Sequence, residues 1–118
     1  MTLKEYEALP ISDGVMADLR GLGRRHPALL EDLLKGLEEL VERDVEDSCL
    51  VAQNGQIGIY LEPPRYVLRH FPSPAALVRV DHKARSFEIV ECIDEYGGIG
   101  EGDQWTALCG RAWALLDR

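Results

Sequence analysis

The sequence lacks the features that would assign a location directly. No apolar run approaches the roughly 18 residues that a membrane-spanning helix needs. The first residues, Met1–Glu7, carry acids and no apolar core, so we expect no signal peptide. The cysteines, Cys49, Cys92 and Cys109, show no CxxC spacing and sit among apolar neighbours. We therefore expect a soluble, cytoplasmic protein whose thiols are buried and reduced.

Metal and cofactor motifs are also missing. The three histidines form no HxH or HExxH pattern, and the acids do not follow the spacing of an EF-hand loop. The run Gly97–Gly102 lacks the lysine and hydroxyl residue of a P-loop and does not match GxGxxG, which favours a flexible connector. We expect no metal and no cofactor.

Positive charge is scarce, because 13 Lys and Arg stand against 21 Asp and Glu, for a net charge of −8. A strongly acidic chain repels a polyanion at long range, so nucleic-acid binding would need a local basic patch. The charge either serves solubility or favours a protein partner with a basic surface.

The 118 residues predict one domain with a real core, and the first half predicts two helices. Segment 12–43 reads as an αα-hairpin in which Ser12 or Asp13 caps the first helix and Pro27 opens the second. Gly23–His26 is the expected break between them. The second helix carries an apolar stripe made of Leu30, Leu33, Leu34, Leu37, Leu40 and Val41.

The middle of the chain, 49–93, predicts antiparallel strands joined by connections too short for parallel pairing. Asn54-Gly55 indicates a first hairpin, Arg65–Phe71 a further strand, and Pro72–Pro74 a turn. Segments 76–81 and 86–93 predict a second hairpin across His82–Arg85.

Segment 103–117 predicts a C-terminal helix with Asp103 as its cap. We expect its tryptophans, Trp105 and Trp113, to pack on the sheet, with an exposed anchor for a partner as the alternative. The predicted fold class is α+β: an N-terminal αα-hairpin packed on a four- to five-stranded antiparallel meander sheet, with a C-terminal helix.

The segment Ala76–Val90 resembles the central hairpin of the RelE/ParE superfamily of bacterial toxins, in which an apolar strand ends in Arg-Val-Asp, turns through a basic segment and returns as an apolar strand. The resemblance implies a strand before the helices, within Leu3–Ile11. It also implies a toxin whose basic and aromatic residues position mRNA on the sheet. However, Ile93–Tyr96 stands where the family commonly has a Gly-His-Arg-like cluster, and Pro74–Ala76 replaces a further arginine.

Two functions follow. The leading hypothesis is an acidic, non-catalytic protein-binding domain on a RelE/ParE-like scaffold that inhibits or regulates a partner protein, with an acidic binding surface between positions 91 and 103. The candidate binding residues are Glu91, Asp94, Glu95, Glu101 and Asp103.

The alternative is an active toxin of a type II toxin–antitoxin system, either a metal-independent, ribosome-dependent ribonuclease or a blocker of a cellular target. Its candidate catalytic residues are Arg65, Arg69, Arg79, His82 and Tyr96. A basic, concave sheet face would favour the toxin and a continuous acidic face the binder. The oligomeric state stays open, since Leu3, Tyr6, Leu9 and Ile11 can pack on their own domain or on a second copy.

Overall fold

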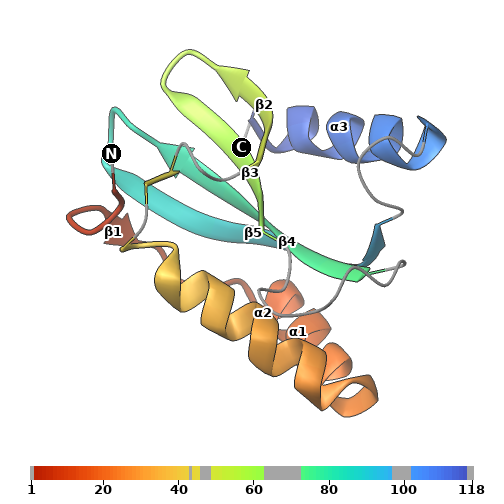
Figure 1. Ribbon diagram of the computed structural model, residues 1–118. Helices are drawn as coiled ribbons and strands as arrows, with labels where there is room; N and C mark the ends of the chain where they lie inside the picture. Colours follow the sequence, from red (N-terminus) through yellow and green to blue (C-terminus); the bar gives the residue numbers. More distant parts are fainter. Residues whose placement is uncertain (1, 43, 46–48, 63–72, 97–101, 117–118) are drawn as a thin grey trace.

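The computed structural model describes residues 2–42, 44–45, 49–62, 73–96 and 102–116 (Figure 1). Their helices and strands are, in chain order, β1 (Glu7–Ala8), α1 (Asp13–Arg25), α2 (Pro27–Glu39), β2 (Cys49–Asn54), β3 (Ile57–Glu62), β4 (Ser73–Asp81), β5 (Ser86–Tyr96) and α3 (Gly102–Leu116).

The strands form one sheet in the order β1-β5-β4-β3-β2. Strands β2 to β5 are an antiparallel meander, whereas β1 runs parallel to β5 through Glu7 opposite Ser86 and Ala8 opposite Phe87. The α+β class, the helical hairpin and the C-terminal helix are confirmed. The sheet is mixed, however, because β1 lies far from β5 along the chain and no short turn forces the two to run in opposite directions.

The helical hairpin forms largely as its sequence predicts. Ser12 is the N-cap of α1 and its Oγ accepts a hydrogen bond of 3.3 Å from the Val15 N–H, while Pro27 is the first residue of α2. The helix α1 continues through Gly23 to Arg25, so the break predicted at Gly23–His26 is reduced to His26 alone. A Cβ at Gly23 would lie 2.6 Å from Leu30 Cδ2, so this glycine lets the two helices approach closely.

Two short turns fix the register of the meander. Asn54 pairs with Ile57, so the loop of the first hairpin is Gly55-Gln56, one residue later than Asn54-Gly55. Gly55 has φ +60°, which suits the first position of a type II′ turn. In the second hairpin, Asp81 pairs with Ser86 across His82–Arg85, as predicted.

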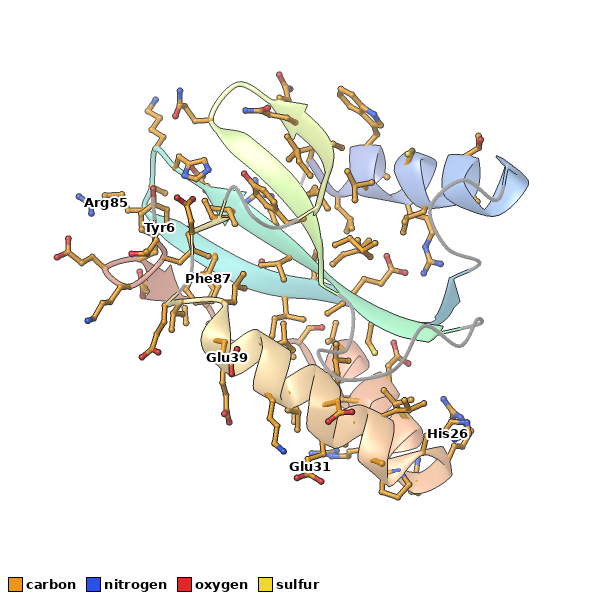
Figure 2. The ribbon with its side chains drawn as sticks, viewed as in Figure 1. Tyr6, His26, Glu31, Glu39, Arg85 and Phe87 are labelled. Carbon is orange, nitrogen blue, oxygen red and sulfur yellow. The ribbon has the colours of Figure 1, made fainter. Side chains whose placement is uncertain are left out.

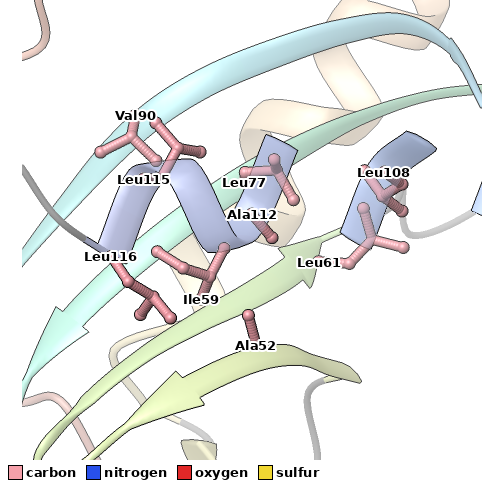
Figure 3. Packing of buried hydrophobic residues seen from close by; sticks show 9 residues of the cluster. All are labelled: Ala52, Ile59, Leu61, Leu77, Val90, Leu108, Ala112, Leu115 and Leu116. Atoms are coloured by element: carbon pink, nitrogen blue, oxygen red, sulfur yellow. The ribbon is translucent and has the colours of Figure 1, made fainter. Parts of the chain in front are cut away.

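Helices cover both faces of the sheet (Figure 1). Side chains alternate along β4, so Ala76, Val78 and Val80 face the helical hairpin and Leu77 faces α3. The core on the α3 side (Figure 3) gathers residues from four strands and one helix: Ala52, Ile59, Leu61, Leu77, Val90, Leu108, Ala112, Leu115 and Leu116.

Several predicted boundaries are wrong. Helix α2 ends at Glu39, short of the predicted end of the hairpin at residue 43. Strand β4 begins at Ser73 and includes Pro74, where a turn was expected. Pro74 is tolerated because the register shifts there and β3 reaches only as far as Ala76 on β4. Strand β5 extends to Tyr96, and α3 begins at Gly102, so Asp103 lies inside the helix. The strand predicted at 65–71 lies outside the described residues.

The central position of Leu77 predicts a large cost of truncation. Leu77 lies in β4 and is fully buried against α3. Leu77→Ala is therefore expected to lower the free energy of unfolding by about 2–5 kcal/mol. Leu34→Ala, on the exposed face of α2, is the matched control and should cost no more than about 0.5 kcal/mol. Urea denaturation measures both, and equal losses would contradict the packing described here.

Candidate functional site

A surface hollow of about 520 Å³ lies where the N-terminal turn meets the loop between β4 and β5. Its lining combines basic side chains with hydroxyl groups and one carboxylate: Thr2, Lys4, Glu5, Tyr6, His82 and Arg85. The two segments that form it are separated by most of the chain, and the hollow is therefore a product of the tertiary fold.

The N-terminal turn is held in place by backbone hydrogen bonds to β5 and by the packing of Leu3. The N–H groups of Glu7 and Leu9 donate hydrogen bonds of 2.9 and 2.8 Å to the carbonyl oxygens of Arg85 and Phe87. Leu3 is fully buried in a core cluster with Leu40 and Val45. The side chains of the hollow are thus carried by a backbone that packing and pairing hold in place.

Tyr6 and His82 form the closest polar contact in the hollow. The Tyr6 hydroxyl lies 2.9 Å from His82 Nδ1, and the two rings meet edge to face with centroids 5.7 Å apart. When the tyrosine hydroxyl donates to Nδ1 of the neutral imidazole, Nε2 carries the ring hydrogen and becomes the donor of the pair.

Arg85 is placed over the Tyr6 ring, with its guanidinium carbon 5.5 Å from the ring centroid. Its Nη2 lies 3.3 Å from Glu5 Oε2, and both side chains are more than half exposed. Figure 2 shows Tyr6 and Arg85 together at one end of the sheet, far from His26 at the tip of the helical hairpin. An ion pair this exposed is worth only about 0–1 kcal/mol, so it can open readily.

Asp81 shapes the loop that carries His82 and Arg85. Its Oδ1 accepts hydrogen bonds from the Lys83 N–H (3.0 Å) and the Ala84 N–H (2.9 Å). The bond from Ala84 is the main reason that the pKa of Asp81 lies below its usual value; partial desolvation opposes this, and Lys83 and Arg79 lower the pKa further. Arg85 completes the turn with φ +56°, a left-handed conformation.

Of the candidate catalytic residues, the described structure places the side chains of only Arg79 and His82, and it puts them on opposite faces of the sheet. Arg79 pairs across the sheet with Ile59 and so faces α3, whereas His82 bonds to Tyr6 on the face of the helical hairpin. Arg65 and Arg69 lie outside the described residues, and of Tyr96 only the backbone, at the end of β5, is described.

The predicted acidic surface is only partly described. Glu91 is ion-paired with Arg111 of α3, and three quarters of its side chain is buried. Asp94 and Glu95 lie in β5 and Asp103 lies in α3, with side chains outside the described part of the structure, as is the whole of Glu101. Glu91 therefore joins α3 to the sheet.

Trp113 does not pack on the sheet as expected, because 54% of it is exposed. Arg111 reaches toward β5 from one flank of α3. Two residues further on, Trp113 is about 200° around the helix from Arg111, on the other flank of α3. The buried stripe is completed instead by Leu115. The side chain of Trp105 lies outside the described residues.

Strand β2 is the edge of the sheet on that side and pairs, within the described chain, only with β3. Leu50 of β2 is 44% exposed and lies on the opposite face from α3, opposite Tyr60. Leu50 is therefore exposed on one face of this strand, while the helix that packs on the other face, α3, carries the exposed Trp113.

Sequence reasoning did not find the hollow. Tyr6 and His82 are 76 positions apart, and the parallel β1–β5 pairing that joins their segments has no local signature. Within the described ranges, no three His, Cys, Asp or Glu side chains gather closely enough to hold a metal ion. None of the described helices is long and apolar enough to cross a membrane.

Comparison with known proteins finds no family model, no curated protein and no solved structure that matches the chain.

The lowered pKa of Asp81 predicts how its loop responds to acid. The ionised carboxylate accepts the two loop hydrogen bonds, so its contribution to stability is present above the unfolded-state pKa and is lost as the pH falls through the lower, folded-state pKa. The difference in unfolding free energy between wild type and Asp81→Ala should therefore shrink as the pH falls below about 4. Carbon NMR titration of the Asp81 carboxyl should give a midpoint below 3.8, and a midpoint above that value would contradict the geometry of the turn.

Proposed function

We propose that this chain is a non-catalytic protein-binding domain, on a RelE/ParE-like scaffold, that inhibits or regulates a partner protein. The observation that carries the proposal is Trp113, which is 54% exposed on α3, the helix that packs against the edge strand β2. Tryptophan is enriched among the residues that dominate binding energy at protein interfaces. Its exposure here leaves a large apolar surface for a partner to bury.

The edge strand β2 supports the same proposal. An edge strand presents backbone donors and acceptors that a partner strand can pair with, and alternate side chains then supply specificity. Leu50, on the other face of β2, gives the partner a second apolar contact. We define the edge surface as β2 together with Leu50 and Trp113.

The charge of the chain indicates what kind of partner it binds. The net charge is −8, and the helix α2 carries Glu31, Asp32, Glu38 and Glu39 against the single cation Lys35. Figure 2 shows Glu31 and Glu39 on the side of α2 that points away from the sheet. Such a field speeds the encounter with a basic protein and repels nucleic acid. We propose a partner with a basic surface and a cytoplasmic location.

The alternative of a ribonuclease toxin has less support. Its charge clamp and its acid–base group would need to share one face, but Arg79 and His82 lie on opposite faces of the sheet. The element order, a strand before the helical hairpin and then a meander, agrees with what the family resemblance implies. We therefore propose that the chain has a RelE/ParE-like scaffold but no ribonuclease activity.

Trp113→Ala tests the proposal. The tagged chain is used to recover partners from its native host, and the variant is expected to lose the specific partner by at least about tenfold, as hot-spot truncations do. Leu34→Ala, which removes an exposed leucine from α2 on the other side of the sheet, is the matched control and should retain the partner. Added salt should slow association with the same partner.

If wild type and Trp113→Ala recover the partner equally, the edge surface does not bind it. Recovery of ribosomes by both would favour the toxin instead.

A further inference from the structure

We propose that the hollow between the N-terminal turn and the β4–β5 loop binds the phosphate group of a small phosphorylated ligand. The hollow is distinct from the edge surface and is built from other elements. The two proposals therefore stand or fall separately.

The hollow carries local positive charge in an acidic chain. Two cations, Lys4 and Arg85, line the hollow together with the imidazole of His82, against one carboxylate, Glu5. Lys83 adds an exposed cation in the same loop. The lining thus gathers positive charge although the chain as a whole carries −8. A concave basic spot on an otherwise negative molecule concentrates anions there.

The lining also supplies several hydrogen-bond donors. Arg85 offers a guanidinium fork, Lys4 an ammonium group, and His82 the Nε2–H that remains when Nδ1 accepts from Tyr6. These donors come from two separate segments of the chain and line the same hollow. A tetrahedral phosphate, with three strong acceptor oxygens, uses donors from several directions, whereas a planar carboxylate is satisfied by one arginine fork.

Arg85 already binds one anion, the carboxylate of Glu5. Its Oε2 lies 3.3 Å from Arg85 Nη2, and the pair is exposed and therefore weak. An incoming phosphate displaces this internal carboxylate from Arg85. Arg85 is meanwhile kept over the hollow by its contact with the Tyr6 ring, 5.5 Å from the guanidinium carbon to the centroid.

The backbone beneath these groups is preorganised. The buried Leu3 and the two hydrogen bonds to β5 hold the N-terminal turn, and the bonds to Asp81 Oδ1 hold the loop. Little ordering is needed when the ligand arrives, which lowers the cost of binding.

The test is a titration of the purified full chain with inorganic phosphate and with glycerol 3-phosphate, followed by amide NMR shifts at constant ionic strength. Saturable shifts are expected at Lys4, Tyr6, His82 and Arg85, with the phosphate ester binding at least as tightly as inorganic phosphate. Arg85→Gln should weaken binding about tenfold, through loss of a charge-assisted hydrogen bond.

Glu5→Gln gives the more discriminating result. It removes the competing carboxylate and should tighten binding several-fold, an effect that a merely structural Glu5 would not produce. Arg24→Gln changes the charge of an exposed arginine in α1 and is the matched control, expected to leave the affinity unchanged.

Three results would overturn the proposal. The first is no saturable shift around the hollow with either phosphate probe. The second is the same response to phosphate for Glu5→Gln, Arg85→Gln and Arg24→Gln. The third is acetate that binds as tightly as phosphate, since the hollow would then be a simple carboxylate site. None of these results depends on Trp113, so failure here is separable from failure of the edge surface.

Discussion

The burial of β4 on both of its faces is the constraint on which the rest of the structure depends. Ala76, Leu77, Val78 and Val80 are all fully buried, and consecutive side chains of a strand point to opposite faces. One helical layer cannot cover both faces, so the helical hairpin packs on one and α3 on the other. Burial of apolar surface on each side supplies the main driving force for this arrangement.

Because helices cover both faces of the sheet, the ends and the edge of the sheet are where we place the proposed binding sites. The face that α3 covers is not open to a nucleic acid at Leu77 or Ile59. At one end, β1 brings the N-terminal turn beside the β4–β5 loop and creates the basic hollow. At the other edge, Leu50 of β2 is exposed, as is Trp113 of α3. The acidic charge and the basic hollow thus serve different proposed partners.

Local patterns predict most of the elements. The cap at Ser12, the first-turn Pro27 and the hairpin across His82–Arg85 all act over a few residues, and each is present in the structure. The stripe of α2 is only partly correct, because Leu34 is exposed and Leu40 and Val41 follow the end of the helix. The predictions fail where long-range packing decides. Pro74 reads as a turn but joins β4 beyond the end of β3, and β1 pairs in parallel with a strand some 80 positions away.

The two candidate sites were less predictable than the fold, because both depend on long-range packing. The helical period places Trp113 near the margin of the apolar stripe, and only the position of α3 over the sheet decides that Leu115 is buried in its place. His82 was identified as a candidate from its residue type. Its partner, Tyr6, depends on how the first strand docks, which no short pattern encodes.

Native-state hydrogen exchange of the α3 and β4 amides tests the central claim most directly, because it reports whether α3 stays closed over the sheet. The account predicts that the amides of Leu77 and Val78 in β4 and of Ala112 and Leu115 in α3 exchange only by global unfolding, with similar free energies. Exchange in α3 that is far faster than in β4 would show that the helix leaves the sheet in solution. The closed, three-layer account would then be contradicted.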